Sequence, residues 1–440
     1  MSKIKNQHMS IRWQDIIKSD ENVSAHSASL KEKATLVGRV GLMMLSVGTG
    51  AWRVRNSMNK ISRALDISCS ADIGLVSILY TCIDGNDTYT QSLSIPNTGV
   101  NTSKLMDLEL FIRKFPELAK ENSVGQFHKM LDEIQNKKGN YNAWTVGFAA
   151  AAACGAFTFL LGGGIVEMIC AFFGAGIGNF IRKKMIERKI SLLANVGISV
   201  AAACVAYVIA VLAVQKLFGI SKIHQAGYIC SMLFVIPGFP LITGGIDMAK
   251  LDMRSGIERC TYAVLIITAA TLTGAATALL FKFQPADFPT LEIETKTLIV
   301  FRIIASFLGV YNFSLMFNST KRMALTAGLI GMLTNTLRLE LIELAGFPVV
   351  FAAFIGAFCT GYIASVVKRK IGFPRISLTV PAIVIMVPGL YMYRGIYHMG
   401  LSDVSNGALW LTKAILIVIA LPLGLVAARL CTDKDFRHCT

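Results

Sequence analysis

The apolar pattern of the chain changes abruptly near Ala143, and this change limits the possible folds more than any other feature. Before it, charged and apolar residues alternate as in a soluble domain; after it, long apolar segments are separated by short polar breaks. With 54% apolar residues, 16% charged residues and a mean hydropathy of +0.56, the chain is far too apolar for an ordinary soluble domain. The sequence therefore predicts a cytosolic domain followed by a membrane-spanning bundle.

The apolar segments have the length of transmembrane helices. A helix needs about 20 apolar residues to cross the hydrocarbon layer. The expected fold class is therefore a polytopic α-helical membrane protein with about ten transmembrane helices and an N-terminal cytosolic α+β domain. The predicted spans are 143–161, 163–181, 191–214, 226–246, 260–281, 298–317, 323–342, 347–367, 376–394 and 408–430.

Basic residues predict the orientation of these spans. Residues 1–30 contain Lys3 and Lys5 but no following apolar core, so they do not resemble a signal peptide and the N-terminus is expected in the cytosol. With this start, seventeen lysines and arginines fall on the inner connections and five on the outer ones, or six if Lys413 is counted, as the positive-inside rule requires. Both termini are therefore expected in the cytosol. The net charge of +16 reflects this bias, and no nucleic-acid partner is expected.

The soluble part has the periodicity of a small α+β domain. Asp84-Gly85-Asn86-Asp87 has the composition of a hairpin turn, and Gly48 and Gly50 separate two amphipathic helices. The expected helices are 30–47, 51–65, 102–119 and 123–138, and the expected strands lie within 67–82 and 88–95. The expected domains are a polar tail 1–32, the α+β domain 33–142, a first membrane module 143–283 and a second one 297–431.

Few residues of the sequence indicate enzyme activity. Five side chains of the soluble domain could be drawn as a hydrolytic site, but turn acids and a solvated helix face explain them more simply. The sequence has no GxxxxGK[ST], GxSxG or HExxH motif and no Cys/His cluster with metal spacing. We therefore expect no enzyme activity, no cofactor and no metal. The five residues are Asp84, Asp87, His128, Asp132 and Glu133.

A repeated motif stands out in the membrane half. Pro237-Gly238 is followed by Gly244 and Met248, and Pro388-Gly389 is followed at the same spacing by Gly395 and Met399. Because five spans separate the copies, the two segments cross the bilayer in opposite directions, as in a 5+5 inverted repeat. Helices interrupted by proline and glycine at matching positions indicate a transporter's binding site, although a simple kink is the alternative.

Charged residues inside spans are costly and are often functional. Glu167 lies in the second predicted span, Asp247 at the inner end of the fourth and Arg302 near the outer end of the sixth. Asp247 is three residues past Gly244, close to the expected break. These three residues are the candidate intramembrane charges.

These segments resemble the threonine/serine exporter family, in the form that joins both modules in one chain. The resemblance covers about residues 33–431. Departures from the family pattern at Arg55 and Gly244 leave room for a shifted substrate preference. The segments that carry the resemblance are Gly48-Thr49-Gly50-Ala51-Trp52-Arg53-Val54, Gly99-Val100-Asn101, Pro237-Gly238-Phe239-Pro240-Leu241-Ile242-Thr243 with Asp247, Asp252, Ser255-Gly256 and Arg259, Val380-Pro381, and Val387-Pro388-Gly389-Leu390-Tyr391 with Tyr393-Arg394.

The resemblance implies export of threonine and serine across a bacterial inner membrane, driven by the proton gradient. Asp247 would contact the substrate ammonium or carry the coupling proton, with Glu167 as a second proton site. The substrate-binding candidates are Pro237, Gly238, Thr243, Asp247, Pro388, Gly389, Tyr391 and Tyr393.

Other functions remain open at this point. A passive channel or a dicarboxylate carrier could use the same scaffold, since split-chain relatives of the family are associated with succinate export. A membrane-tethered enzyme or regulator acting through the soluble domain is the third class. The expected partners are a small-molecule substrate, protons and lipid, and a homo-oligomer stays open. Gly174 and Gly178 permit close helix packing, and contact with lipid or within the chain is the expected use of these glycines.

Overall fold

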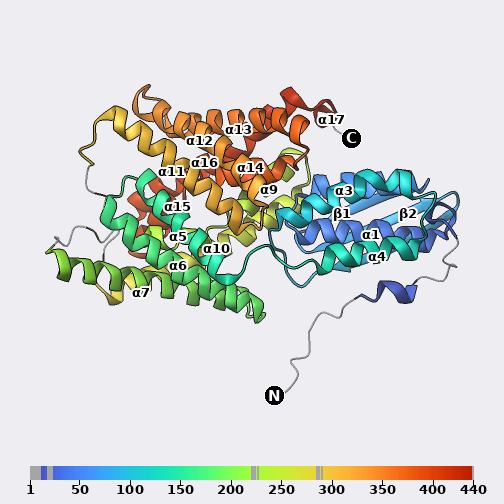
Figure 1. Ribbon diagram of the computed structural model, residues 1–440, viewed down its shortest axis with the longest axis horizontal. Helices are drawn as coiled ribbons and strands as arrows, with labels where there is room; N and C mark the ends of the chain where they lie inside the picture. Colours follow the sequence, from blue (N-terminus) through green and yellow to red (C-terminus); the bar gives the residue numbers. More distant parts are fainter. Residues whose placement is uncertain are drawn as a thin grey trace, which may run out of the picture. The chain divides into compact units, whose positions relative to one another are not determined.

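The structure is a computed structural model that describes residues 11–16, 23–219, 224, 227–283, 288 and 291–438 (Figure 1). Lys3, Lys5 and part of the predicted polar tail lie outside these residues. The chain divides into two compact units. The first contains Met1–Lys138 and Asp247–Arg259, and the second contains Gly139–Ile246 and Cys260–Thr440. The segment Asp247–Arg259 thus belongs with the N-terminal residues, unlike the division expected from the sequence.

The first unit contains a three-stranded antiparallel sheet in the order β1-β2-β3 together with four α-helices. The four predicted helices are confirmed to within two residues at each end, and so is the turn at Asp84–Asp87. The predicted strand 67–82 is divided into two strands at Gly74. The elements are η1 (Trp13–Ile16), η2 (Ala25–Ser27), α1 (Leu30–Ser46), α2 (Ala51–Ala64), β1 (Ser68–Ile73), β2 (Ser77–Asp84), β3 (Asp87–Ser94), α3 (Thr102–Leu118) and α4 (Val124–Asn136).

Local capping explains where three of these helices begin. Ser29 and Glu32 form a capping box at α1, Ser123 and Gln126 form one at α4, and the Asn101 side chain accepts the Lys104 N–H at α3. Helix α2 differs, because its N-cap is Gly50, which has no side chain to accept a hydrogen bond.

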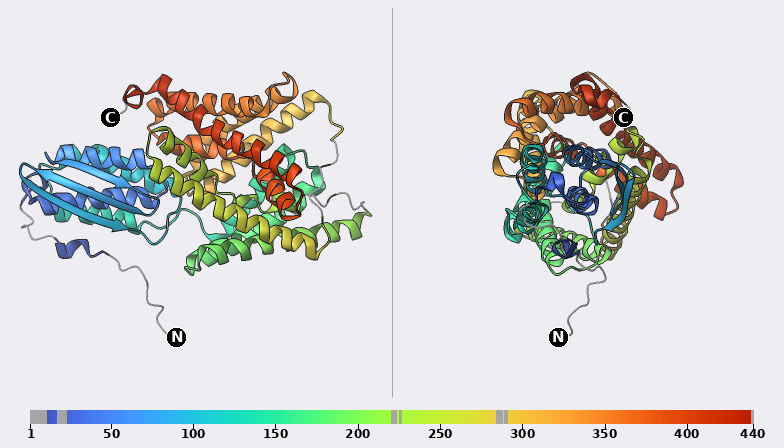
Figure 2. Two further views of the ribbon diagram at one scale, coloured as in Figure 1. Left: turned by 180° about the vertical axis from the view of Figure 1, so that it is seen from behind. Right: turned by 90° about the vertical axis from the view of Figure 1, so that its right-hand side faces the viewer.

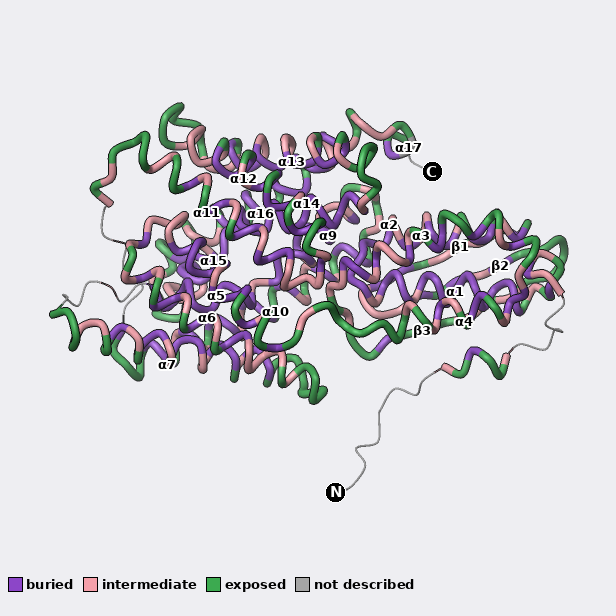
Figure 3. Tube along the Cα trace, in the orientation of Figure 1, coloured by how far each residue is buried: buried purple, intermediate pink, exposed green. Residues whose placement is uncertain are grey.

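Helices α1 and α2 pack on one face of the sheet (Figure 2). Ile78, Tyr80 and Cys82 alternate along β2 and are buried, whereas Leu79 and Ile83 point the other way and are 46% and 41% exposed. Helices α3 and α4 pack against α1, so buried positions follow α1 along its length (Figure 3). The core of the first unit therefore surrounds α1.

The second unit is helical. Its helices include α9 and α10. The C-terminal end of α9 and the N-terminal end of α10 belong to the segment assigned to the first unit. The elements are α5 (Ala143–Leu160), α6 (Ile165–Glu187), α7 (Leu192–Phe218), α8 (Tyr228–Ser231), η4 (Leu233–Val235), α9 (Gly238–Ala249), α10 (Met253–Leu280), α11 (Thr295–Met316), α12 (Lys321–Glu343), α13 (Val349–Ile371), α14 (Arg375–Val384), α15 (Gly389–Gly400), α16 (Val404–Thr432) and α17 (Lys434–Arg437).

Length and composition qualify several of these helices as membrane spans. Among the described residues, seven helices are long and apolar enough to cross a bilayer, or up to nine if each of two bent pairs forms one span. Large apolar side chains are exposed on them, for example Ile209 at 62% and Leu212 at 53% on α7, as expected for a surface in contact with lipid. Helix α12 coincides with the predicted span 323–342 but is not among the nine. The second unit is therefore a polytopic membrane bundle, and the count of ten stays a prediction.

Candidate functional site

Each Pro-Gly motif marks a sharp bend in the second unit. The segment Tyr228–Val235 meets α9 at 55°, and α14 meets α15 at 52°. Proline cannot donate a backbone hydrogen bond, so the ladder is interrupted at Pro237 and Pro388. Helices α9 and α15 each start at the glycine that follows. The predicted breaks therefore lie at the predicted residues.

The two breaks pack against each other in a reciprocal way. A Cβ atom added at Gly238 would lie 3.2 Å from Val384 and 3.4 Å from Val387, next to the second break. One added at Gly389 would lie 3.0 Å from Leu233 and 3.2 Å from Ile236, next to the first. Glycine at both positions thus allows the two bent backbones to approach closely.

A buried hydrogen bond links the same two bent segments. The hydroxyl groups of Tyr228 on α8 and Tyr393 on α15 lie 2.7 Å apart, and each residue is only 1% exposed. Their rings meet edge to face at 5.9 Å. Sequence analysis proposed Tyr393 but missed Tyr228, because nothing in its spacing distinguishes it from other apolar positions of the segment.

Two other predicted hydroxyl groups have different surroundings. The Thr243 hydroxyl donates to the Phe239 carbonyl at 2.9 Å, one turn back along α9. Tyr391 packs on Trp410 with ring centroids 5.1 Å apart, and the Arg394 guanidinium lies 5.0 Å from the same indole. Of the predicted hydroxyl groups, the structure therefore brings Tyr393 to the contact between the breaks.

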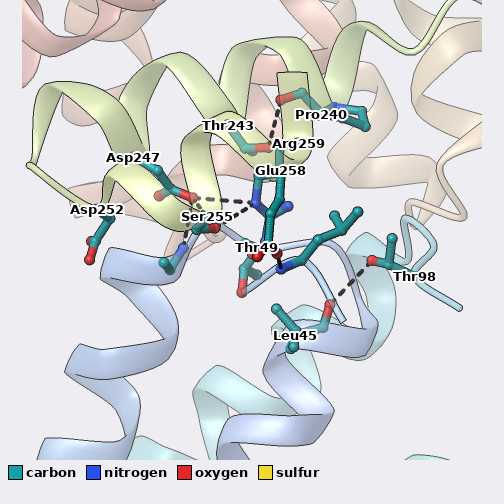
Figure 4. Close-up of polar contacts among 12 residues, drawn as sticks. Leu45, Thr49, Thr98, Pro240, Thr243, Asp247, Asp252, Ser255, Glu258 and Arg259 are labelled. Carbon is teal, nitrogen blue, oxygen red and sulfur yellow. Dashed lines mark hydrogen bonds and ion pairs between the residues drawn. The ribbon is translucent and has the colours of Figure 1, made fainter. Parts of the chain in front are cut away.

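Asp247 lies in the first unit, in a buried cluster (Figure 4). Its Oδ2 accepts hydrogen bonds from the Ala51 N–H at 2.9 Å and from the Ser255 hydroxyl at 3.0 Å. Arg259 Nε lies 3.3 Å from the same oxygen, and Arg259 also donates to the Thr49 carbonyl at 2.6 Å. Ala51 is the first residue of α2, so Asp247 provides the cap that Gly50 lacks.

Gly50 is required for this approach. A Cβ atom at Gly50 would lie 2.5 Å from Asp247 Oδ1. The negative carboxylate also complements the positive end of the α2 dipole. The segment Thr49-Gly50-Ala51 and the segment Asp247–Arg259 therefore form one structural unit, although the two are about 200 residues apart in the sequence.

Further ion pairs hold the segment Asp247–Arg259 within the first unit. Arg55 of α2 contacts Asp252 at 2.6 Å, and Glu258 accepts the Leu75 N–H at 2.5 Å. Arg254 pairs with Asp72 of β1. Arg55, one of the two residues that depart from the family pattern, thus forms an ion pair with Asp252.

The remaining candidate charges are paired in the second unit. Glu167 is 1% exposed and its Oε1 lies 2.7 Å from Nδ1 of His224. Arg302 contacts Glu340 at 3.0 Å and also Glu343. Sequence analysis missed His224 as a partner because a single histidine in a loop carries no pattern.

The described residues contain no group of three or more His, Cys, Asp or Glu side chains that could hold a metal ion. In the first unit, Asp84 pairs with Lys33 at 3.6 Å, whereas His128 and Asp132 contact Arg39. Burial and the neighbouring Arg39 lower the pKa of His128 to about 3, so this imidazole is neutral at pH 7.

The long apolar helices define a polytopic membrane protein. A sequence profile described as "Putative threonine/serine exporter" matches residues 35–281, and one described as "Threonine/Serine exporter, ThrE" matches residues 302–431. The chain belongs to the threonine/serine exporter family, which confirms the resemblance found in the sequence.

Two similar proteins are named as threonine/serine exporters, and a third is named as a subunit of a succinate transporter. A "Threonine/serine exporter" of Corynebacterium glutamicum is 24% identical over 90% of this chain and 82% of its own length. A "Probable threonine/serine exporter" of Mycobacterium tuberculosis is 23% identical over 88% and 74%. A "Probable succinate transporter subunit YjjP" of Escherichia coli is 27% identical over 54% of this chain and 90% of its own length. No solved structure matches the chain.

Proposed function

We propose that the protein exports small hydroxy amino acids, L-threonine and L-serine, from the cytosol, driven by the proton gradient. The observation that carries the proposal is the pair of bent helices at Pro237-Gly238 and Pro388-Gly389, whose breaks pack reciprocally in a member of an exporter family.

The chemistry of a broken helix suits a zwitterionic amino acid. The first N–H groups of a helix lack acceptors within it, and the macrodipole makes that end positive. The starts of α9 and α15 would therefore bind the substrate carboxylate, and carbonyl groups at the ends of η4 and α14 would accept from its ammonium group. Thr243, Tyr391 and Tyr393 are the proposed partners of the substrate hydroxyl.

An inverted repeat is proposed for the membrane bundle. Helix α6 packs against α5, α7 and α8, and α12 packs in the same way against α11, α13 and α14. The two bends fall at matching places in these series. This parallel supports a 5+5 repeat. We propose in addition that the bundle lies in the plasma membrane with both termini in the cytosol.

Asp247 and Glu167 are the proposed proton-coupling residues. Each carboxylate is 1% exposed and lies within 3.5 Å of a basic side chain, Arg259 for Asp247 and His224 for Glu167. Protonation of either carboxylate would remove its negative charge and weaken its contact with the basic side chain, which would link proton binding to a change of conformation. Because Asp247 also caps α2, its variants need a stability measurement beside the transport measurement.

A dicarboxylate exporter is the second candidate. The supporting observation is the relative named as a succinate transporter subunit, which covers 54% of this chain. A passive channel on the same scaffold would also move small solutes but could not move them uphill.

The test is efflux from proteoliposomes that contain the purified full chain and are loaded with labelled threonine, serine or succinate. Our proposal predicts loss of threonine and serine that exceeds empty liposomes and is reduced by the Gly389→Ala substitution. Gly400→Ala on the same helix is the matched control, because a Cβ atom there would have no neighbour within 4 Å. Loss of succinate alone would support the second candidate and refute the first.

A further inference from the structure

A cavity of about 110 Å³ lies within the first unit, between α1, α3, α4 and η1. A single water needs only about 10–15 Å³ of such space, so the cavity can hold a small organic molecule. Its walls are mainly apolar, with Leu42, Val47 and Leu108 among the lining residues. Two basic residues, Arg39 and Lys104, also line it, and among the described residues no carboxylate does.

Arg39, one of the residues that line this cavity, retains an unused donor. The side chain is 1% exposed, and its Nη atoms donate to the His128 carbonyl at 3.0 Å, to Gln135 at 3.1 Å and to Asp132. Its Nε has no hydrogen-bond partner among the described residues. An unsatisfied buried donor is costly, by about 1–3 kcal/mol, so an acceptor that reached it would be bound favourably.

The charged side chains around the cavity favour the binding of one negative group. Asp132 compensates Arg39, whereas the Lys104 ammonium donates to the Gln135 carbonyl at 2.6 Å, which is a neutral partner. One uncompensated positive charge beside an apolar wall favours a ligand with a single carboxylate and an apolar body. A zwitterion would leave its ammonium group without a carboxylate partner.

Trp13 completes the wall of this cavity. Its indole stacks on the His128 ring at 5.8 Å and lies 5.6 Å from the Arg39 guanidinium. Trp13 is 8% exposed although it belongs to a four-residue 3-10 helix near the start of the chain. The aromatic ring thus adds apolar surface next to the unused donor of Arg39.

We infer that this cavity is a binding site for a small monocarboxylate with an apolar body. The carboxylate lies between Arg39 and Lys104, and the apolar body lies against Leu42, Val47 and Leu108. The site belongs to the first unit and is additional to the proposed transport function, which gives no role to this cavity.

Binding of isovalerate to the purified full chain tests the inference. The probe is a branched monocarboxylate, and isovaleramide has the same shape without the charge. Isovalerate is expected to bind saturably and to raise the melting temperature of the protein, whereas isovaleramide is expected to do neither. Saturable binding of the amide equal to that of the acid, or no saturable binding of the acid, would overturn the inference.

Matched variants locate the site. Lys104→Gln is expected to weaken isovalerate binding at least tenfold, and Leu42→Trp is expected to abolish it by filling the cavity. Lys114→Gln removes an exposed lysine from the same helix α3 and is expected to bind as the unmodified protein does. If a variant fails to fold, the comparison of acid with amide on the unmodified protein still decides. Unchanged binding in folded Lys104→Gln and Leu42→Trp variants would contradict the inference, whatever the transport assay shows.

Discussion

Replacing Asp247 by asparagine would remove one charge of a buried ion pair and keep an oxygen for the Ala51 N–H and the Ser255 hydroxyl. Asp247 and Arg259 are both 1% exposed, and the pair is 3.3 Å apart. At an effective dielectric constant of about 20, two unit charges at this separation attract each other by roughly 5 kcal/mol. Removing one partner of a buried pair costs about 3–5 kcal/mol, because the other charge stays buried.

We therefore expect Asp247→Asn to lower the free energy of unfolding of the first unit by about 3–5 kcal/mol. Arg259→Gln should have a similar effect, and the double variant should lose less than the sum, with a coupling of about 2–3 kcal/mol. Arg254→Gln is the control, since its pair with Asp72 is about half exposed and should contribute at most about 1 kcal/mol.

The assay is urea unfolding of the full chain in detergent, with pulse proteolysis to follow the first unit. The shift in the urea midpoint, multiplied by the slope of the unfolding curve, gives each difference in unfolding free energy. An Asp247→Asn variant within about 1 kcal/mol of the unmodified protein would refute the reasoning. The reasoning would also be refuted if the losses of unfolding free energy in the two single variants added up in the double variant.

Three further predictions follow from buried groups. Because the pKa of His128 is lowered to about 3, the unfolded state binds one more proton than the folded state between about pH 6.5 and 3. The free energy of unfolding should therefore decrease as the pH is lowered through this range, by up to about 1.4 kcal/mol per pH unit, and a His128→Gln variant should lack this slope in acid titrations of stability. Tyr228→Phe or Tyr393→Phe should each cost about 1–2 kcal/mol in denaturant unfolding, and a double variant that lost their sum would contradict the hydrogen bond. Gly389→Ala should lower the melting temperature more than Gly400→Ala, since its Cβ atom would lie 3.0 Å from a leucine of the other break; equal shifts would contradict the close packing.

Much of the first unit could be predicted because its signals are local. Ser29, Asn101 and Ser123 precede helical periodicity and each caps the helix that follows. The division of the first predicted strand was missed, because β-forming residues continue through the turn in which Gly74 donates to the Ser77 carbonyl at 2.8 Å. A single glycine inside a strand pattern is also typical of a β-bulge, so it does not by itself predict a turn.

The candidate site was predictable only in part. The Pro-Gly pairs act on their own backbone, so the two bends could be placed from the sequence. The contact between the breaks and the Tyr228–Tyr393 hydrogen bond depend on packing between distant segments. The partner of Asp247 is a backbone N–H 196 residues away, and backbone donors have no sequence signature.

Coupling to the proton gradient is the part of the proposed function that distinguishes an exporter from a passive channel. The most direct test is net movement of labelled threonine against its concentration gradient in right-side-out vesicles that contain the full chain, with and without an uncoupler. Our account predicts uphill threonine efflux that stops when the uncoupler collapses the proton gradient. Threonine movement that only equilibrates, at the same rate with and without the uncoupler, would contradict it.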